Sequence, residues 1–331
     1  MLSLARLVRE LSILLKSKPC LVRADSENCR LFFSYLLCSS IGFIKVMLMN
    51  CAWEAYLNIL PSRLRPLVDK SSETLQDIRL RLNEHPILCT QLGRTTLDTV
   101  ITPQDLQYCI NAASSYSPWT AKTIADGFIT ARGGHRIGIC GDAVVSGGKM
   151  EGIRAATSLA IRVARDYVGI AAGLEKIAGS VLIIGSPGTG KTTLLRDLIR
   201  RRSSLPGICV SVVDERQEIF PLLRQGDLFH PGDNTDILTG CPKPQGVIQV
   251  LRNMGPSVIA VDEITSKQDC QALTEAAWCG VDLVATAHAR NAKEFYASVV
   301  YKPLIQCGIF QTLVVLRSDK TWYTERIPHE Y

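Results

Sequence analysis

Residues 181–193 read VLIIGSPGTGKTT, and this stretch decides the fold. Its four apolar residues predict a buried strand, the glycine-rich run predicts a tight loop, and the apolar pattern of residues 194–199 predicts a helix. The run matches the phosphate-loop pattern G-x-x-x-x-G-K-[ST], in which backbone N–H groups and a helix N-terminus receive a phosphate. The predicted nucleotide-binding residues are Gly185, Ser186, Pro187, Gly188, Thr189, Gly190, Lys191, Thr192 and Thr193. In this pattern Lys191 reaches the β and γ phosphates of ATP, and the Thr192 hydroxyl holds Mg²⁺.

A second apolar strand ends in two adjacent carboxylates. Residues 257–263 read SVIAVDE, so Asp262 and Glu263 stand directly after a run typical of a buried strand. Downstream of a phosphate loop this is the Walker B arrangement. Asp262 then belongs to the Mg²⁺ shell, and Glu263 polarises the attacking water as the catalytic base. The alternative is an Asp-Glu pair that caps a helix after a core strand.

An acidic segment lies between these two motifs in the chain. Residues 212–218 read VVDERQE, with three acids and one arginine directly after an apolar run. One interpretation is a solvated loop with local ion pairs. The other is an extra strand between the two Walker strands, which brings Asp214 or Glu215 to the edge of the nucleotide as a catalytic carboxylate. RecA-like ATPases with an extra strand have this order of elements.

Another strand is predicted to end in threonine and histidine. Residues 281–288 read VDLVATAH. In a RecA-like sheet this strand lies between the two Walker strands, so its end faces the γ-phosphate. His288 would then donate a hydrogen bond to that phosphate and report its loss. The alternative is a surface histidine at a strand end.

The spacing of these motifs predicts the fold class. From about residue 178, strands and helices alternate in the βα manner of a parallel sheet. We therefore expect an α/β fold, a RecA-like P-loop ATPase domain with a mostly parallel sheet, preceded by a smaller α+β domain. The expected strands are 181–184, 208–213, 258–261, 283–286 and 312–316. The expected divisions are a leader at 1–48, the α+β domain at 49–170 and the ATPase domain at 171–331.

No motif in the smaller domain indicates a chemical function. Residues 72–82 carry apolar residues at helical spacing after a serine cap, and a second helix is expected to start at 102–105, with proline in its first turn. Residues 127–130 and 135–140 predict two strands joined as a hairpin, and the alternation in 156–164 predicts a further strand.

The net charge of +6 is concentrated near the N-terminus. Residues 1–48 hold seven basic and three acidic residues, which gives +4 and leaves only +2 for the rest of the chain. A nearly balanced ATPase portion is a poor electrostatic footprint for nucleic acid. The alternative function, a RecA-like motor stimulated by nucleic acid, is therefore disfavoured.

The leader contains an uncharged run at 31–44, flanked by Arg30 and Lys45. A membrane-spanning helix needs about 20 apolar residues, so this run falls short. Two interpretations remain: a membrane-surface anchor, or a gene-start artefact in which translation begins at Met47 or Met49.

Cysteine usage indicates a reducing compartment. The chain has twelve cysteines, no C-x-x-C pair, and no Cys/His cluster with zinc spacing. Cys140 and Cys209 lie in apolar runs, where we expect them to be small buried hydrophobic residues. We therefore expect a cytosolic protein.

Taken together, the motifs resemble a known family. The Walker pair, segment 214–218 and the strand end at 286–288 resemble the type II and type IV secretion-system ATPases, with an "Asp box" at 214–218 and a "His box" at 287–291 (AHARN). The closer resemblance is to the stage III sporulation protein AA family. It is carried by GHRIG at 134–138, VDER at 213–216, TDIL at 235–238, CPK at 241–243 and VDEI at 261–264.

This resemblance covers about residues 50–320 and leaves the leader out. Asn234 stands where the family pattern has arginine, which puts one arginine contact in doubt, and Thr265 stands where it has glycine. Neither position belongs to the expected catalytic core. The resemblance also makes Met49 the expected start.

The resemblance implies a cytoplasmic ATPase that assembles as a homohexamer on a membrane. Its partners would be membrane channel proteins of the same apparatus, which in sporulation connects mother cell and forespore; no nucleic-acid partner is expected. Arginines from one subunit's N-terminal domain would complete the neighbouring subunit's site, stabilising charge on the transferring phosphoryl group. The candidates for this role are Arg154 and Arg162, with Arg136 and Arg165.

Overall fold

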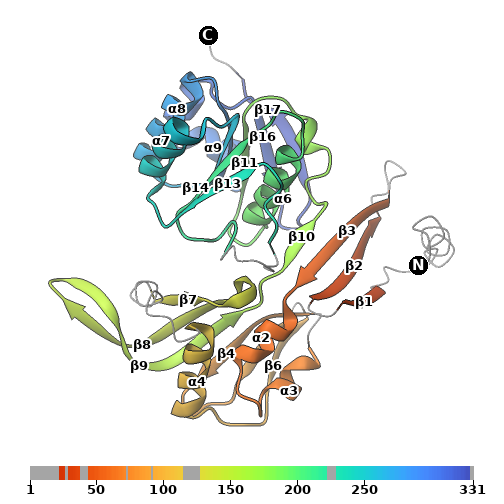
Figure 1. Cartoon of the computed structure of the whole chain (residues 1–331), viewed down its shortest axis with the longest axis vertical. Helices are drawn as coiled ribbons and strands as arrows, with labels where there is room; N and C mark the ends of the chain where they lie inside the picture. The colour runs from red at the N-terminus through yellow and green to blue at the C-terminus, as the bar shows by residue number, and fades with distance from the viewer. Residues whose placement is uncertain are drawn as a thin grey trace. The chain divides into compact units, whose positions relative to one another are not determined.

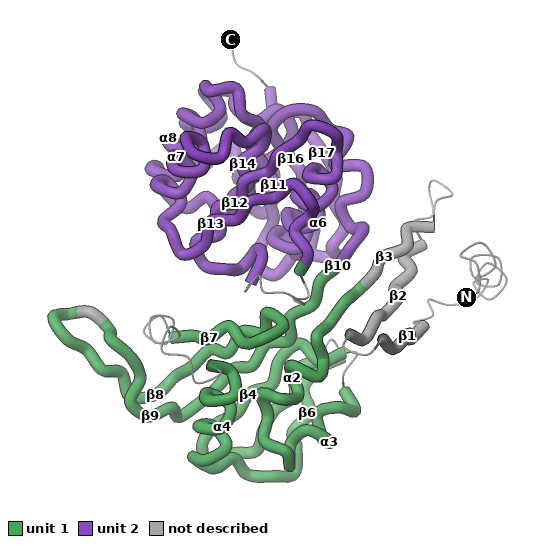
Figure 2. The backbone as a smooth tube through the Cα atoms, viewed as in Figure 1, with its two compact units in different colours: residues 1–166, 222–229 green, residues 167–221, 230–331 purple. Residues whose placement is uncertain are grey.

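The structure is a computed structural model that describes residues 22–26, 29–37, 44–71, 74–90, 92–114, 127–221 and 229–328. The chain divides into two compact units (Figure 2). Unit 1 comprises residues 1–166 and 222–229, and unit 2 comprises residues 167–221 and 230–331.

Unit 2 is built on a seven-stranded sheet with the strand order β13-β12-β14-β15-β11-β16-β17. All neighbouring strands pair in parallel except β17, which runs antiparallel to β16. The strands are β11 (Val181–Gly185), β12 (Val210–Asp214), β13 (Thr235–Thr239), β14 (Val258–Ile264), β15 (Asp282–His288), β16 (Thr312–Leu316) and β17 (Trp322–Arg326). The short strand β10 (Asp166–Val168) spans the division between the units.

Helices cover both faces of this sheet (Figure 1). They are α6 (Lys191–Ser203), α7 (Lys243–Met254), α8 (Lys267–Trp278), α9 (Ala292–Ala297) and α10 (Lys302–Gln306), with a 3-10 turn η3 (Leu174–Lys176). Because side chains alternate along a strand, Leu182 and Ile184 enter one core, which they share with α7, α8, α9 and α10. Helix α6 lies on the opposite face (Figure 1).

The α/β fold with a mostly parallel sheet that the sequence predicts is confirmed. Each of the five expected strands is present, and β15 lies between β11 and β14 as predicted. The acidic segment does follow an extra strand, β12. In the sheet, however, β12 flanks β14 on the side away from β11, so it does not lie between the two Walker strands.

Unit 1 contains a six-stranded antiparallel sheet with the order β6-β5-β4-β9-β8-β7. Its strands are β4 (Leu75–Arg81), β5 (Ile87–Thr90), β6 (Gly93–Thr96), β7 (Phe128–Thr130), β8 (Arg136–Ser146) and β9 (Lys149–Arg162). Its helices are α2 (Trp53–Ile59), α3 (Arg65–Asp69) and α4 (Pro103–Ser114), with a 3-10 turn η2 (Arg132–Gly134). The core joins the helices to the sheet through side chains such as Trp53, Tyr56 and Ile161.

The helix predicted at 72–82 is wrong, because the described part of this segment is the strand β4. Its apolar residues fit a helical spacing only because the strand is irregular. The pairing of β4 with β5 shifts register between Leu75 and Asp77, so buried Leu75 departs from the alternation that Ile78 and Leu80 follow. Ser72, the expected cap, lies outside the described residues.

The other secondary-structure elements predicted for this unit are present. Helix α4 begins at Pro103, where Thr102 and Asp105 exchange side-chain to backbone hydrogen bonds in the manner of a capping box. Strands β7 and β8 form the expected hairpin. Strand β9 contains most of the strand predicted at 156–164, but it begins earlier, at Lys149, and ends at Arg162.

The described part of the leader is extended. Strands β1 (Val22–Ser26), β2 (Cys29–Leu37) and β3 (Ile44–Cys51) pair antiparallel in chain order. Within the described ranges, no helix is both long and apolar enough to cross a bilayer. The two interpretations of the leader remain predictions.

The burial predicted for Cys140 and Cys209 is wrong, since both are exposed. Cys140 follows buried Ile139 in β8, and alternation turns its side chain to the other face of the strand. Among the cysteines whose burial the structure describes, those that act as small core residues are Cys51, Cys109 and Cys270.

His135 is fully buried in unit 1, and both ring nitrogens are engaged. Its Nε2 lies 2.9 Å from the carbonyl oxygen of Ala52, and its Nδ1 accepts a hydrogen bond from the Ala164 N–H at 3.0 Å. A neutral ring with its proton on Nε2 satisfies both contacts. Burial lowers the pKa of His135 from its ordinary 6.5 to about 4, and the charge of Arg165 acts in the same direction.

We predict that folding of unit 1 becomes less favourable as the pH falls from about 6.5 to about 4. Within this window the unfolded chain binds a proton at His135 and the folded chain does not. The free energy of unfolding is therefore highest above pH 6.5 and falls by roughly 3 kcal/mol across the window. The measurements are an NMR titration of the ring and denaturant unfolding at neutral and acidic pH. A ring that titrates near pH 6.5 in the folded protein would contradict the prediction.

Candidate active site

The glycine-rich loop joins β11 to α6 in a conformation that requires glycine at two positions. Gly188 and Gly190 have φ of 75° and 104°, and a Cβ at either position would meet open space, so conformation rather than crowding selects glycine. Gly185 is required for a different reason. A Cβ there would lie 2.6 Å from Thr189 Oγ1 and 3.2 Å from the carbonyl oxygen of Leu316. The loop is therefore shaped by its own backbone and held close to β16.

Lys191 folds back over the loop. Its Nζ donates to the carbonyl oxygens of Gly185, at 3.0 Å, and Ser186, at 3.3 Å. Burial lowers the pKa of Lys191, while the nearby carboxylates of Glu263 and Asp262 raise it. The ammonium group of Lys191 thus interacts electrostatically with both Walker B carboxylates. To bind a phosphate, it would exchange its two hydrogen bonds to loop carbonyl oxygens for contacts with the phosphate.

Asp262 links β14 to the first turn of α6 through a hydrogen bond. Its Oδ2 accepts a hydrogen bond from Thr192 Oγ1 at 2.8 Å. Mg²⁺ in proteins commonly uses one or two carboxylates, phosphate oxygens and water rather than an all-protein cage. Thr192 and Asp262 bring one hydroxyl and one carboxylate together, which fits such a site. They are the pair that would hold the ion, and this role stays a prediction.

Glu263 occupies a bulge in β14. Val261 pairs with Ala285 and Ile264 pairs with Ala287, so two residues of β14 stand opposite the single residue Thr286 of β15. Glu263 has φ of 34°, and it is the only non-glycine residue with positive φ inside a described strand. Bulges re-aim side chains next to active sites. Here the bulge turns Glu263 toward the pocket described next.

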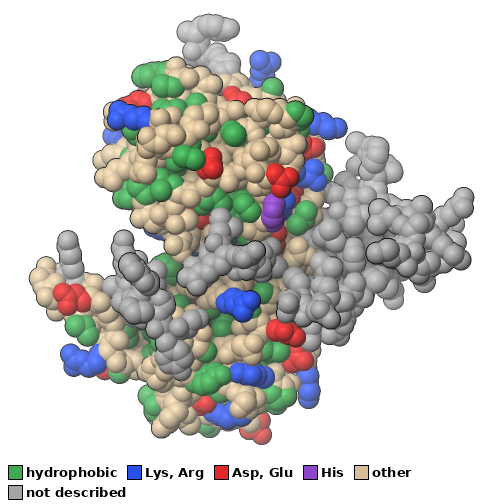
Figure 3. Space-filling model, viewed as in Figure 1, with side chains coloured by type: hydrophobic (Ala, Val, Ile, Leu, Met, Phe, Trp, Pro, Cys, Tyr) green, Lys and Arg blue, Asp and Glu red, His purple; other side chains and the backbone are tan. Residues whose placement is uncertain are grey.

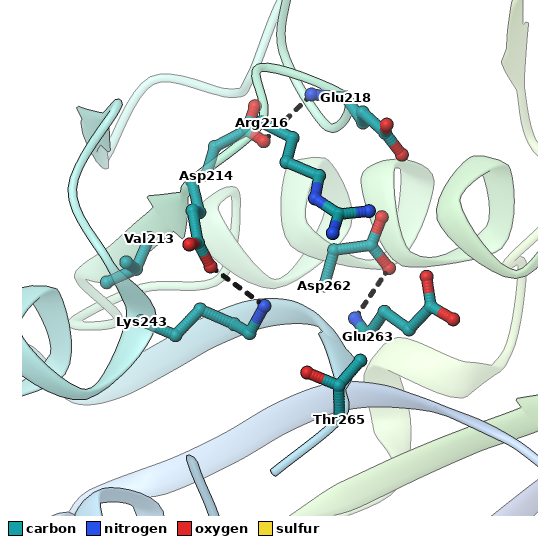
Figure 4. A pocket seen from close by; sticks show the side chains of 9 residues that line it. Val213, Asp214, Arg216, Glu218, Lys243, Asp262, Glu263 and Thr265 are labelled. Atoms are coloured by element: carbon teal, nitrogen blue, oxygen red, sulfur yellow. Dashed lines mark hydrogen bonds and ion pairs between the residues drawn. The ribbon is translucent and has the colours of Figure 1, made fainter. Parts of the chain in front are cut away.

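A small pocket lies at the carboxyl ends of β12 and β14 (Figure 4). Its lining is rich in carboxylates and carries two basic side chains. The lining residues are Val213, Asp214, Glu215, Arg216, Glu218, Lys243, Asp262, Glu263 and Thr265.

The two predicted carboxylates of the acidic segment differ in their surroundings. Asp214 is buried, and its oxygens accept hydrogen bonds from three consecutive backbone N–H groups, residues 218–220, at 2.9–3.0 Å. Burial raises the pKa of Asp214, and these three bonds oppose the shift. Its geometry favours holding the loop in shape over a catalytic role. Glu215 is 37% exposed, lines the pocket and forms an ion pair with Lys243 at 3.0 Å.

Sequence reasoning assigned no role to Lys243. It is the first residue of α7, and its side chain is only 11% exposed despite its charge. The available signal was Pro244 in the first turn of an amphipathic run, which is typical of a helix start. That signal predicts the helix, but the contact with Glu215 depends on a loop and strand that bring residues 28 positions apart together.

His288 ends β15 beside the phosphate loop. In the parallel pairing of β11 with β15, Gly185 stands opposite His288. The backbone N–H of His288 donates to the Tyr301 hydroxyl at 3.2 Å, and that hydroxyl also lies 3.4 Å from the carbonyl oxygen of Ile264. Tyr301 therefore ties the ends of β14 and β15 together. The imidazole itself is exposed at the edge of the sheet where the loop begins.

The candidate arginines all lie in unit 1. Arg154 and Arg162 are exposed on β9. Arg136 lies over the ring of Phe128, with its guanidinium carbon 4.1 Å from the centroid. Arg165 donates to the carbonyl oxygen of Leu75 at 2.6 Å. The first two are thus the more accessible pair, and their predicted role in a neighbouring subunit's site stays a prediction.

The chain is similar to sporulation proteins in sequence. The profile of the family described as "Sporulation stage III, protein AA" matches residues 52–326. Stage III sporulation protein AA of Bacillus subtilis (strain 168) is 35% identical over 284 residues, which are 82% of this chain and 92% of that protein.

Two solved structures are similar in fold. The ATPase DotB of Legionella pneumophila has a TM-score of 0.51 at 18% identity, with 79% of this chain and 78% of that chain covered. The pilus retraction motor PilT with bound ADP has a TM-score of 0.54 at 14% identity, with 80% and 82% covered. At these identities the likeness establishes the shared fold, which confirms the RecA-like fold class predicted from the sequence.

Proposed function

Because the chain belongs to the sporulation stage III protein AA family, we propose that it is a Mg-ATP-hydrolysing motor that energises a membrane secretion or channel apparatus. The main support for the proposal is that residues of the two Walker motifs lie in hydrogen-bond contact. Thr192 at the start of α6 is bonded to Asp262 at 2.8 Å, and Glu263 follows Asp262 in the bulge of β14. A phosphate cradle, a metal-holding pair and a carboxylate base are the parts that phosphoanhydride hydrolysis requires.

Each side chain has a role in this proposal. Lys191 leaves the loop carbonyls and binds the β and γ phosphates, and the N–H groups of the glycine-rich loop orient them. Thr192 and Asp262 would hold Mg²⁺, and the ion would supply positive charge that stabilises the negative charge developing on the phosphates. Glu263 orients the attacking water and receives its proton. Glu215 adds a second carboxylate at the pocket. His288, at the end of β15, donates a hydrogen bond to the γ-phosphate.

The proposal extends to assembly and location. We place the ATPase domain at 171–331 and the smaller domain at 49–170, with the protein acting as a homo-oligomer, in the family's manner a hexamer. Arg154 and Arg162 of one subunit would then approach the neighbouring subunit's phosphates. The working site would be a membrane channel between mother cell and forespore, with the protein bound peripherally on the cytoplasmic, mother-cell side. The similarity to stage III sporulation protein AA of Bacillus subtilis supports the sporulation setting.

Steady-state phosphate release by the purified full chain tests the function. We expect hydrolysis that requires Mg²⁺ and ceases with EDTA, and a particle mass that rises with a non-hydrolysable ATP analogue. No nucleotide binding would overturn the proposal, and a monomer under both conditions would overturn the role of Arg154 and Arg162. Hydrolysis stimulated by single-stranded DNA with a steep salt dependence would favour a nucleic-acid motor instead. On the face in Figure 3, described basic side chains are dispersed among acidic ones, which disfavours that outcome.

A further inference from the structure

Thr286 is a buried hydroxyl between the two Walker B carboxylates. It lies in β15 with no exposed surface, opposite the bulge that contains Asp262 and Glu263. On its other side, it pairs with Ile183 of β11. A threonine at the centre of an apolar sheet must satisfy its hydroxyl locally, because an unpaired buried hydroxyl is destabilising.

The hydroxyl is satisfied by the site itself. Thr286 Oγ1 donates to Asp262 Oδ1 at 2.5 Å and accepts a hydrogen bond from the Glu263 backbone N–H at 2.8 Å. Asp262 Oδ1 also lies 3.0 Å from the same N–H, which closes a small network. A hydroxyl can act as donor and acceptor at once, whereas neither an amide N–H nor a carboxylate can.

This network fixes two features on which the proposed reaction depends. With Oδ1 engaged by Thr286, the carboxylate of Asp262 presents Oδ2 to Thr192, where the ion would be held. The bond to the Glu263 N–H stabilises the bulge, in which Glu263 adopts its unusual φ of 34°. Positive φ in a non-glycine residue persists only where the surroundings impose it.

We propose that Thr286 is a positioning residue for turnover: its hydroxyl sets the orientation of Asp262 toward the metal and holds Glu263 in the bulge that aims it at the substrate. This inference rests on the proposed ATPase function. It assigns Thr286 no contact with the substrate, so its effect is exerted through the two carboxylates.

The test compares Thr286→Val, which keeps the shape and removes the hydroxyl, with Thr286→Ser, which keeps the hydroxyl and removes the methyl group. We expect Thr286→Val to reduce kcat about ten- to a hundredfold, the usual effect of losing a buried hydrogen bond to a charged group. Thr286→Ser should stay within about threefold of the wild type. The matched control is Thr274→Val, because Thr274 is also buried in unit 2 and its hydroxyl bonds only to the carbonyl oxygen of Cys270 in its own helix.

A second readout separates positioning from general loss of structure. Affinity for a fluorescent ADP analogue is measured in EDTA and in Mg²⁺. For Thr286→Val we expect EDTA affinity like that of the wild type, but a several-fold smaller gain on adding Mg²⁺. Equal loss in both conditions would show that the substitution damages the phosphate loop, and would overturn the proposal.

The remaining outcomes are also decisive. Near wild-type turnover in Thr286→Val, or a loss in Thr286→Ser as large as in Thr286→Val, would overturn the role of the hydroxyl. If Thr286→Val does not fold, Thr286→Ala replaces it, since Ala and Ser both lack the methyl group and differ only in the hydroxyl. If the wild type binds nucleotide without hydrolysing it, the proposed function fails, while the Mg²⁺-dependent affinity still tests Thr286.

Discussion

Replacing Lys191 with alanine is expected to weaken ATP binding by at least about a hundredfold. The ammonium group is the charged donor of the loop, and charge-assisted hydrogen bonds to phosphate contribute roughly twice as much as neutral ones. The fold should survive, because Lys191 is half-buried and bonds only to the carbonyl oxygens of Gly185 and Ser186. Titration with a fluorescent ATP analogue measures the loss, and circular dichroism checks the fold.

The matched control is Lys302→Ala. Lys302 is an exposed residue at the start of α10 in the same unit, so its removal changes the net charge equally. It should bind ATP like the wild type. If Lys191→Ala binds ATP as tightly as the control does, the phosphate loop does not hold the nucleotide and the assignment of the binding site is wrong.

Replacing Glu263 with glutamine is expected to separate binding from turnover. Glutamine has nearly the same shape and tolerates the same backbone, but it cannot accept the proton of the attacking water. We expect ATP affinity within about threefold of the wild type and kcat lower by about 100-fold or more, since general base catalysis typically contributes 10²–10⁴-fold. Binding by titration and phosphate release in a single-turnover experiment provide the two numbers.

Glu275→Gln is the control for this change. Glu275 lies exposed on α8 and is bonded to Gln271, away from β14. Near wild-type hydrolysis by Glu263→Gln would make the base assignment wrong. Glu215 would then be the carboxylate to replace next, because it lines the same pocket and carries its own partner, Lys243.

The site was predictable where function imposes a local pattern. The phosphate loop must follow a buried strand and open a helix, so Val181–Gly185 and Lys191–Ser203 could be anticipated from contiguous residues. The Walker B strand was equally plain, because its apolar run ends in charge. These features depend on residues that are neighbours in the sequence, so the sequence alone is enough to predict them.

Unit 1 shows where local pattern failed. In residues 75–82 the apolar spacing fits a helix, yet the segment pairs with β5 and β9 on its two sides. An irregular register in one strand is enough to make a strand pattern resemble a helical one. The competing partners lie far away in the sequence, so the local pattern could not weigh them.

The sequence by itself determined that this chain carries a phosphate loop, a Walker B pair and a strand ending at His288, because backbone conformation and strand burial select those residues locally. Only the tertiary structure decided how these residues are placed relative to one another. The bulge at Glu263, the contact of Lys243 with Glu215 and the hydroxyl of Thr286 between two carboxylates all depend on pairing between segments that lie apart in the chain. Register is set by pairing between distant segments, and no stretch of sequence contains both partners.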